Sequence, residues 1–342
     1  MTGYTIPWNF TLYKDCKYYP VNASASFAVR YGYNVTVYKG NVTVILSYPE
    51  GADYNIWPRP DGDMSKIKYV YRAGNPMLQW DLDNSDGDYS SVKGHFYIDL
   101  NGTREMKIFT PTNMNITTAV KEQPNYLSDE WENEKEDARC MVDSSNIEIK
   151  EIANKIRNET HSENVWVVAK ALFEWMVNNT EYDFEKCHNG SQYRGTPLET
   201  LKDGKGVCDE LSFLYVSLCR AAGIPARWVE GYMVERNPLK YDRHAWAEFY
   251  DGGWVMVECA GNGSVEYELN KNFGIYEPDH ISLFFDDGTN ESQEYGRMYS
   301  GGQYYDYPPD WEIYQQYDAL GYNKMYLAVY PDGYRELVKE ME

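Results

Sequence analysis

A cysteine, a histidine and a glutamate within residues 204–258 are the side chains best suited to covalent chemistry in this chain. Cys208 follows the glycines of GKGVCDEL and precedes an apolar stripe with helical spacing over residues 211–222. Cys208 is therefore predicted at the amino terminus of a helix, where backbone N–H groups and the helix dipole favour a thiolate. The same N–H groups can stabilise an oxyanion on an attacked carbonyl. A buried structural cysteine is the alternative interpretation.

A thiolate nucleophile needs a base, and His244 is the histidine best placed to provide one. It lies in RHAWAEFYDGGWVMVE, whose alternation predicts two antiparallel strands. His244 and Glu258 share a face only if the turn between the strands is odd in length or contains a bulge, and residues 251–253 suit either. A glutamate beside the imidazole would fix its tautomer and stabilise its charged form. A purely structural hydrogen bond is the alternative.

Helices and strands elsewhere in the chain must position these residues. Apolar residues at helical spacing predict helices near residues 149–156 and 165–176, with a further helical turn beginning at Thr196. Upstream, β-branched and aromatic runs separated by turn residues predict about seven short strands in a β-sandwich. Near the carboxyl terminus, the pattern predicts a strand at KMYLAVY and a short terminal helix after it.

These elements predict an α+β fold, with a β-sandwich followed by a core in which helices pack on an antiparallel sheet. In chain order, we predict a β-sandwich domain over 1–120, an acidic connector over 121–145, the catalytic core over 146–290, and a Tyr-rich extension packed on the core over 291–342.

Neither the acidic residues nor the cysteines of the chain predict a metal site. An EF-hand loop starting at Asp81 needs glycine and glutamate at positions where the chain has Asp86 and Val92, so DLDNSDGDY is interpreted as a solvated acidic turn. The six cysteines lack CxxC spacing, and five cannot all pair if Cys208 is reserved for chemistry. We therefore expect no metal and no cofactor.

Composition and charge exclude several classes of partner. The chain has 342 residues, 43% of them hydrophobic, and a formal net charge of −21, which disfavours binding to nucleic acid. No stretch approaches the roughly 18 apolar residues of a membrane helix. The first residues, MTGYTIPWNF, lack the pattern of a signal peptide.

The glycosylation pattern Asn-x-Ser/Thr is far more frequent than chance predicts. The asparagines of this pattern are Asn9, Asn22, Asn34, Asn41, Asn101, Asn115, Asn158, Asn178, Asn189, Asn262 and Asn290. With 25 asparagines in the chain, chance predicts about two or three sites. The pattern favours an extracellular or cell-surface protein whose signal peptide is absent from this sequence, and accidental spacing in an Asn-rich chain is the alternative. The acidic, Tyr-rich composition resembles that of archaeal surface proteins.

The motifs around Cys208 and His244 together resemble the core of the transglutaminase-like superfamily. The resemblance rests on GKGVCDELSFLYVSLCRAAGIPARWVEGY, on HAWAEFYDGGWVMVE and on the upstream WMVNNTEYD, and it covers about residues 146–285. The strand-rich region before this core resembles the amino-terminal sandwich of prokaryotic members. The resemblance implies a papain-like site with Cys208 as nucleophile, His244 as general base and later acid, and Glu258 as the acid.

Glu258 departs from the family pattern, which usually has aspartate at this position. The extra methylene moves the carboxylate by about 1.5 Å, and glutamate serves in other triads, so we interpret the change as tolerated. The oxyanion would be bound near Gly206 by the N–H of Cys208 and by a side chain from the Tyr182 region. Trp246 either walls the substrate cleft or belongs to the core.

Three functions follow from the resemblance. The first is a secreted thiol hydrolase of the cysteine-protease or amidase type, acting on proteins or peptides at a cell surface or in a cell wall. The second is a transglutaminase, an acyltransferase that passes the acyl group to an amine and crosslinks proteins. The third is an inactive binding or scaffold module that retains the fold.

Overall fold

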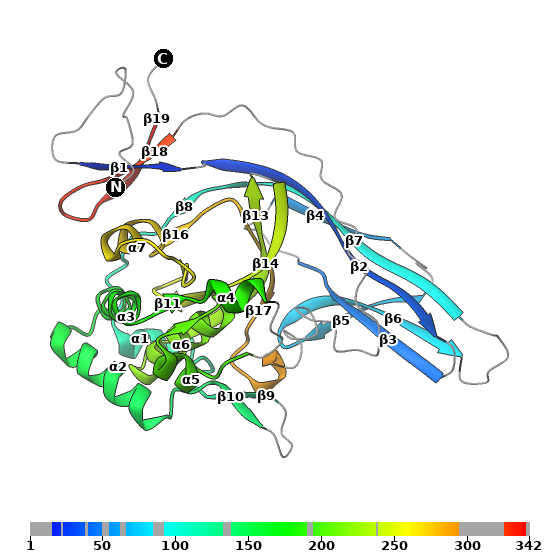
Figure 1. Ribbon diagram of the computed structural model, residues 1–342, viewed down its shortest axis with the longest axis horizontal. Helices are drawn as coiled ribbons and strands as arrows, with labels where there is room; N and C mark the ends of the chain where they lie inside the picture. Colours follow the sequence, from blue (N-terminus) through cyan, green and yellow to red (C-terminus); the bar gives the residue numbers. More distant parts are fainter. Residues whose placement is uncertain are drawn as a thin grey trace.

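The computed structural model divides into a helix-rich body and a region of long curved strands (Figure 1). The described residues are 16–21, 23–37, 40–49, 55–61, 66–84, 92–132, 138–189, 194–236, 239–293 and 325–339. The predicted α+β class is confirmed: a strand-rich amino-terminal region precedes a core of helices on an antiparallel sheet.

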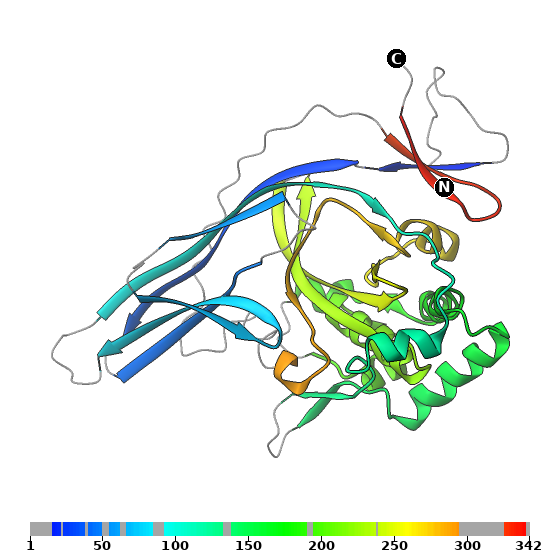
Figure 2. The same ribbon diagram turned by 180° about the vertical axis from the view of Figure 1, so that it is seen from behind.

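Two three-stranded antiparallel sheets form the amino-terminal region, and Figure 2 shows them from behind. One sheet has the order β2 (Ser24–Val37), β7 (Val92–Glu105), β4 (Asn55–Asp61), and the other β3 (Gly40–Ser47), β6 (Asn75–Asn84), β5 (Ile67–Arg72). β4 includes Pro58 and Pro60 and lies at a sheet edge, where proline's missing N–H is tolerated. β2 and β7 are long, with 14 residues each, whereas short strands were predicted.

One hydrophobic cluster joins these sheets to the core of the second region. Its members include Trp80 and Phe96 from the two sheets, and Tyr232 and Ile281 from the sheet of the second region. The sandwich therefore packs directly on the sheet that carries the candidate site. The acidic turn predicted after Asp81 falls largely outside the described residues.

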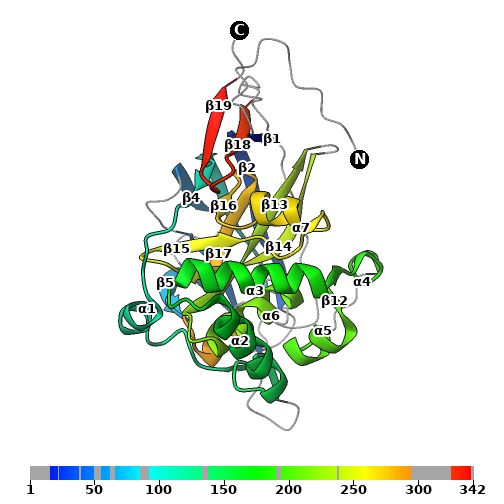
Figure 3. The same ribbon diagram turned by 90° about the vertical axis from the view of Figure 1, so that its left-hand side faces the viewer.

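A four-stranded antiparallel sheet is the centre of the second region. Its order is β15 (Trp254–Val257), β14 (Leu239–Tyr250), β13 (Ala226–Arg236), β17 (His280–Phe285). Alternating residues of β14 and β15, such as Phe249 and Val257, face a large buried cluster that includes the apolar sides of three helices. Figure 3 shows this layer of helices in front of the sheet.

The helices begin where the sequence provides caps. Their bounds are α1 (Ile116–Glu122), α2 (Ile147–Thr160), α3 (Val165–Asn179), α4 (Phe184–His188), α5 (Pro197–Asp203), α6 (Cys208–Ala221) and α7 (Val265–Lys271). Asn146 and Asn164 cap α2 and α3 by accepting hydrogen bonds from first-turn amides. Thr196 and Glu199 form a capping box on α5. The predicted helices around residues 149–156 and 165–176 are confirmed.

A buried ionic cluster fixes the carboxyl end of α6. Arg220 is fully buried, and its guanidinium lies 2.6 Å from Glu130 and 2.6 Å from Asp286, both also fully buried. Glu130 begins β9 (Glu130–Glu132), which pairs with β10 (Arg139–Val142) inside the predicted connector. The cluster thus joins α6 to the connector and to the segment that follows β17.

The described parts of the two chain ends form one small sheet. It has the order β1 (Lys17–Val21), β18 (Met325–Val329), β19 (Arg335–Lys339), and it shares a hydrophobic cluster with β8 (Lys107–Ile108) and β16 (Ile275–Tyr276). The strand at KMYLAVY is confirmed, but the prediction of a terminal helix is wrong because RELVK pairs with β18. Most of the Tyr-rich stretch lies outside the described residues. Among the described residues, no helix is long and apolar enough to cross a membrane.

Candidate active site

Cys208 is the first residue of α6, as its sequence context predicts. The helix starts after Val207, whose N–H donates to Glu210 Oε2 at 3.0 Å. The first-turn amides of a helix have no carbonyl partner within it, so the N–H of Cys208 points outward from the helix end. Cys208 is half-buried, and it therefore remains within reach of a ligand. A half-buried thiol at a helix amino terminus fits the role of a nucleophile better than that of a buried structural cysteine.

The hydrogen bonds of Glu210 hold this helix start in place. Besides the Val207 amide, the Glu210 carboxylate accepts hydrogen bonds from the Gly195 N–H and from Lys186 of α4. Glu210 is almost fully buried, so this carboxylate ties three chain segments together beneath the nucleophile.

His244 and Glu258 share a face because the turn between β14 and β15 has three residues. Tyr250 pairs with Trp254 across Asp251, Gly252 and Gly253, which is the odd length that the same-face arrangement requires. Continued past the end of β15, this register places Glu258 diagonal to His244.

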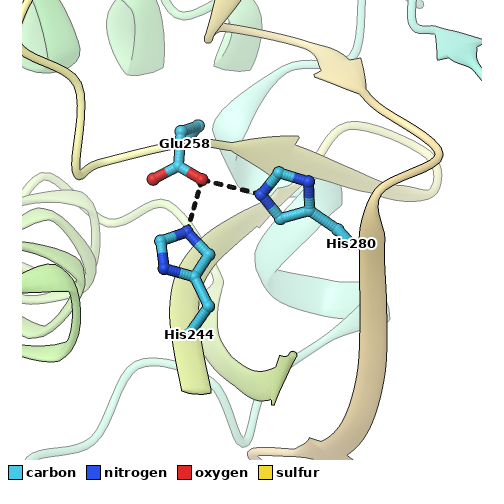
Figure 4. A group of neighbouring side chains, drawn as sticks. All are labelled: His244, Glu258 and His280. Atoms are coloured by element: carbon cyan, nitrogen blue, oxygen red, sulfur yellow. Dashed lines mark hydrogen bonds and ion pairs between the residues drawn. The ribbon is translucent and has the colours of Figure 1, made fainter. Parts of the chain in front are cut away.

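The His244 imidazole lies between Glu258 and Cys208. Its Nε2 donates to Glu258 Oε2 at 2.7 Å, as Figure 4 shows. The Cys208 thiol lies close enough to the same imidazole to contribute to raising its pKa. Glu258 contacts Nε2 of the ring and not Nδ1. The imidazole is therefore a neighbour of both the carboxylate and the thiol.

The electrostatics of these three groups favour a charged imidazole. Burial opposes the charge of His244, but Glu258 and Cys208 outweigh burial and raise the pKa of His244 to about 10. Burial alone would raise the pKa of Glu258, whereas His244 and His280 together lower it well below its usual range. At neutral pH the acid is ionised and the imidazole is protonated, the charge state that an ion pair with a thiolate requires.

Tyr182 lies beside the nucleophile through a short parallel strand pair. β11 (Glu181–Tyr182) pairs with β12 (Lys205–Gly206), so Tyr182 is level with Gly206. Burial and the neighbouring Cys208 raise the pKa of Tyr182, so its hydroxyl keeps its proton at neutral pH and can act as a donor. Gly204, which caps the end of α5, has a left-handed backbone with φ 64°.

Trp246 and Asp251 have structural surroundings. Trp246 is fully buried in a cluster with Val229 and Met256, so it occupies the core position of the two considered for it, with its ring 6.1 Å from that of His244. Asp251 accepts hydrogen bonds from the N–H and hydroxyl of Thr112 at 2.9 Å, which hold it in the turn between β14 and β15.

Three polar residues near the site were not singled out from the sequence. His280, the first residue of β17, donates through Nε2 to Glu258 Oε2 at 2.8 Å, and Asp279 accepts from its Nδ1 at 2.8 Å. Burial lowers the pKa of the Arg194 guanidinium, but the carboxylates of Glu230 and Asp209, with a smaller contribution from nearby Cys208, outweigh burial and raise it. The only signal for His280 was a histidine within the predicted core at the start of the apolar run ISLFF.

Two imidazoles and a carboxylate form a donor set that also suits zinc. The ligand atoms of His244, Glu258 and His280 lie within 4.8 Å of one another. Both imidazoles point Nε2 at a single carboxylate oxygen at hydrogen-bond distance, so a metal would have to displace both N–H protons. The arrangement fits a hydrogen-bonded acid better than a metal centre.

The remaining cysteines do not join this set of groups. All six cysteines lie within the described residues, and no disulfide joins any two of them. Burial raises the pKa of Cys219 to about 12, consistent with the packing role expected for it. Cys187 is exposed on α4, near enough to Tyr182 to contribute to raising the pKa of that hydroxyl.

The site and the fold together define a class of protein. Residues 150–259, which include Cys208, His244 and Glu258, match the family model of the transglutaminase-like superfamily. A candidate cysteine protease from Cytophaga hutchinsonii has a similar fold, with a TM-score of 0.55, 13% sequence identity, and alignment over 90% of this chain and 95% of that one. Residues 150–259 of this chain therefore contain a core of the transglutaminase-like superfamily.

Two sequence relatives extend the comparison. The kyphoscoliosis peptidase of Mus musculus is 27% identical over 167 residues, which cover 45% of this chain and 25% of that protein. An uncharacterised protein of Haemophilus influenzae is 26% identical over 272 residues, 67% of this chain and 70% of that protein. The aligned part of this chain thus spans about a quarter of the length of the mouse peptidase.

Proposed function

We propose that this protein is a thiol hydrolase that cleaves peptide, isopeptide or amide bonds through a Cys208 acyl-enzyme. The observation that carries the proposal is the His244 imidazole, which is hydrogen-bonded to the Glu258 carboxylate and lies near the Cys208 thiol at the start of α6. A nucleophile, a base and an orienting acid require these three groups side by side.

The chemistry proceeds in two halves. The Cys208 thiolate attacks the carbonyl carbon, and the oxyanion that forms is stabilised by the Cys208 N–H and by the Tyr182 hydroxyl. The His244 imidazolium gives its proton to the leaving amine as the C–N bond breaks, which leaves a thioester. His244 then accepts a proton from water, which attacks the thioester and releases the acid and the thiolate. Glu258 stabilises the imidazolium whenever it is charged.

The location of the protein is part of the proposal: we infer a protein or peptide substrate outside the cytoplasm. The seven asparagines of the glycosylation pattern whose side chains are described are all exposed: Asn101, Asn115, Asn158, Asn178, Asn189, Asn262 and Asn290. Of the ten other asparagines with described side chains, four are exposed. Attachment of a glycan requires an accessible asparagine, so this difference supports modification at the surface.

Alkylation of each cysteine by iodoacetamide, followed from pH 5 to 9 by peptide mass spectrometry, tests the activated thiol. We expect Cys208 to react rapidly at pH 6 and His244→Ala to slow it at least about tenfold at that pH, the effect of losing one charge-assisted partner. Exposed Cys187 provides an internal reference within the same sample. A Cys208 that reacts no faster at pH 6 than a free thiol with a pKa of about 8.5 would contradict the proposal.

A peptide-library digestion with Cys208→Ala as the inactive control identifies the bond that is cleaved. Including a primary amine distinguishes hydrolysis from crosslinking, because amine transfer adds the mass of the amine to the acyl product, whereas hydrolysis adds water. Predominant amine incorporation would contradict the assignment as a hydrolase while retaining the acyl-enzyme.

A further inference from the structure

Glu258 is held by more groups than an orienting acid requires. Its Oε2 accepts one hydrogen bond from His244 at 2.7 Å and another from His280 at 2.8 Å, and its Oε1 accepts from the Ala260 N–H at 2.7 Å. Figure 4 shows the two imidazoles approaching the same carboxylate oxygen from different strands. His280 therefore binds the same oxygen, Glu258 Oε2, that accepts from His244.

His280 is held firmly from its other side. Its Nδ1 donates to Asp279 Oδ1 at 2.8 Å, so both ring nitrogens face carboxylates and the imidazole is cationic. The indole ring of Trp246 packs edge-to-face against the His280 imidazole, with the two ring centroids 5.3 Å apart. Burial opposes this charge, but Asp279 and Glu258 outweigh burial and raise the pKa of His280 to about 9.

Charged groups from neighbouring elements also contact this segment. Lys271 of α7 is paired with Glu277 and interacts electrostatically with Asp279. Arg104 of β7 donates to the backbone carbonyl of His280. The ring of His280 is thus enclosed by groups that fix its position.

The strand register explains how two histidines reach one acid. His244 pairs with Gly231 on one side of β13, and on the other side Gly231 pairs with Ser282, two residues beyond His280. Because paired and alternate residues share a face, both histidines lie on the same face of the sheet. Gly231 has no side chain between them, and the two rings approach to 5.3 Å.

We propose that His280, held by Asp279, is a positioning residue that keeps the Glu258 carboxylate aligned on His244. The inference rests on the proposed function of the Cys208 site. Glutamate has one more rotatable bond than aspartate, and Glu258 lies just beyond the end of β15, so its carboxylate needs a second anchor. His280 comes from β17, outside residues 150–259 that match the family model.

The test compares His280→Ala with His280→Gln by the pH profile of Cys208 alkylation. Without His280, Glu258 leaves His244, the imidazolium loses its partner, and the thiolate forms only at higher pH. We expect the alanine variant to move the pH midpoint of alkylation up by about one unit and to lower the rate at pH 6 about tenfold, as for loss of one charge-assisted hydrogen bond. The glutamine variant retains an amide donor near the Nε2 position and should keep most of the wild-type rate.

A double variant shows whether His280 acts through Glu258. In a Glu258→Ala background, His280→Ala should cause no further change, because the residue that it positions is absent. Additive effects would overturn the proposal. A lower folding stability with an unchanged pH midpoint would also overturn it, because that is the result of a purely structural role.

Three further results would each decide between the proposal and its alternatives. If the alanine variant does not fold, Asp279→Asn should move the midpoint in the same direction by a smaller amount, and an unmoved midpoint would overturn the proposal. A wild-type profile that changes on addition of EDTA would place a metal between these residues and overturn it likewise. An inert Cys208 in the wild type refutes the proposed function itself, whereas an active Cys208 insensitive to His280 refutes only this inference.

Discussion

Replacing Arg220 by methionine should destabilise the protein severely. Its guanidinium is paired with two buried carboxylates, those of Glu130 and Asp286. Its Nη1 lies 2.6 Å from Glu130, its Nη2 lies 2.6 Å from Asp286, and its Nε donates to the Ala226 carbonyl at 2.8 Å. Methionine fills a similar volume but leaves both carboxylates without the positive charge. Breaking a buried pair in this way typically costs about 3–5 kcal/mol of the free energy of unfolding.

Urea unfolding followed by tryptophan fluorescence measures this loss, with Arg157→Met as the matched control. Arg157 also donates to a backbone carbonyl and pairs with a carboxylate, but its side chain is 29% exposed and its partner Glu163 is 64% exposed. We expect the control to lose about 1 kcal/mol or less. A loss below about 1 kcal/mol for Arg220→Met itself would refute the reasoning, since it would mean that the carboxylates do not need the cation.

The pH dependence provides a second check on the same variant. Burial and Glu130 already raise the pKa of Asp286, against the opposing effect of Arg220. Without the arginine, one carboxyl of the pair takes a proton more readily in the folded state than in the unfolded state. Stability relative to the wild type should therefore recover as the pH falls from 7 to 5. A deficit that is the same at both pH values would contradict this explanation.

Two further predictions concern the sheet that carries the site. The pKa of His280 is raised to about 9 and that of His244 to about 10, so their stabilising charges are fully present below about pH 6.5 and are lost as the pH rises through 9 and 10. Urea unfolding should show a loss of about 3 kcal/mol from His280 alone, at about 1.4 kcal/mol per unit of pKa shift; constant stability from pH 6.5 to 10 would contradict it. Gly231→Ala places a Cβ 1.9 Å from the Ile281 carbonyl oxygen, and it should cost about 3 kcal/mol or more by the same assay. A Gly231→Ala protein as stable as the wild type would show that β17 moves without cost.

Much of the site followed from local sequence pattern. The start of α6 was predictable because the apolar stripe begins just after Cys208 and the glycines before it interrupt any helix. The shared face of His244 and Glu258 depended on turn length, and the three-residue turn is visible as the DGG of residues 251–253. Both predictions needed information from only a few neighbouring residues.

His280 was not predictable in the same way, because its role depends on long-range strand order. Its strand, β17, pairs with β13, and only that order brings His280 to the side of β13 opposite His244. The terminal helix failed for a related reason: RELVK contains good helix formers, but pairing with β18 outweighs the weak local preference. Domain boundaries at 1–120 and 146–290 remain predictions.

The short pairing of β11 with β12 links Tyr182 and the nucleophile mechanically. Its backbone hydrogen bonds include those from the Glu181 N–H to the Gly204 carbonyl and from the Asp183 N–H to the Gly206 carbonyl, each 2.9 Å long. At a net 0.5–1.5 kcal/mol each, these two bonds together contribute roughly 1–3 kcal/mol. Gly206 lies two residues before Cys208, so the backbone that fixes Tyr182 also fixes the approach to the sulfur. A substitution that disturbs this pairing would therefore misalign the tyrosine hydroxyl and the thiol together.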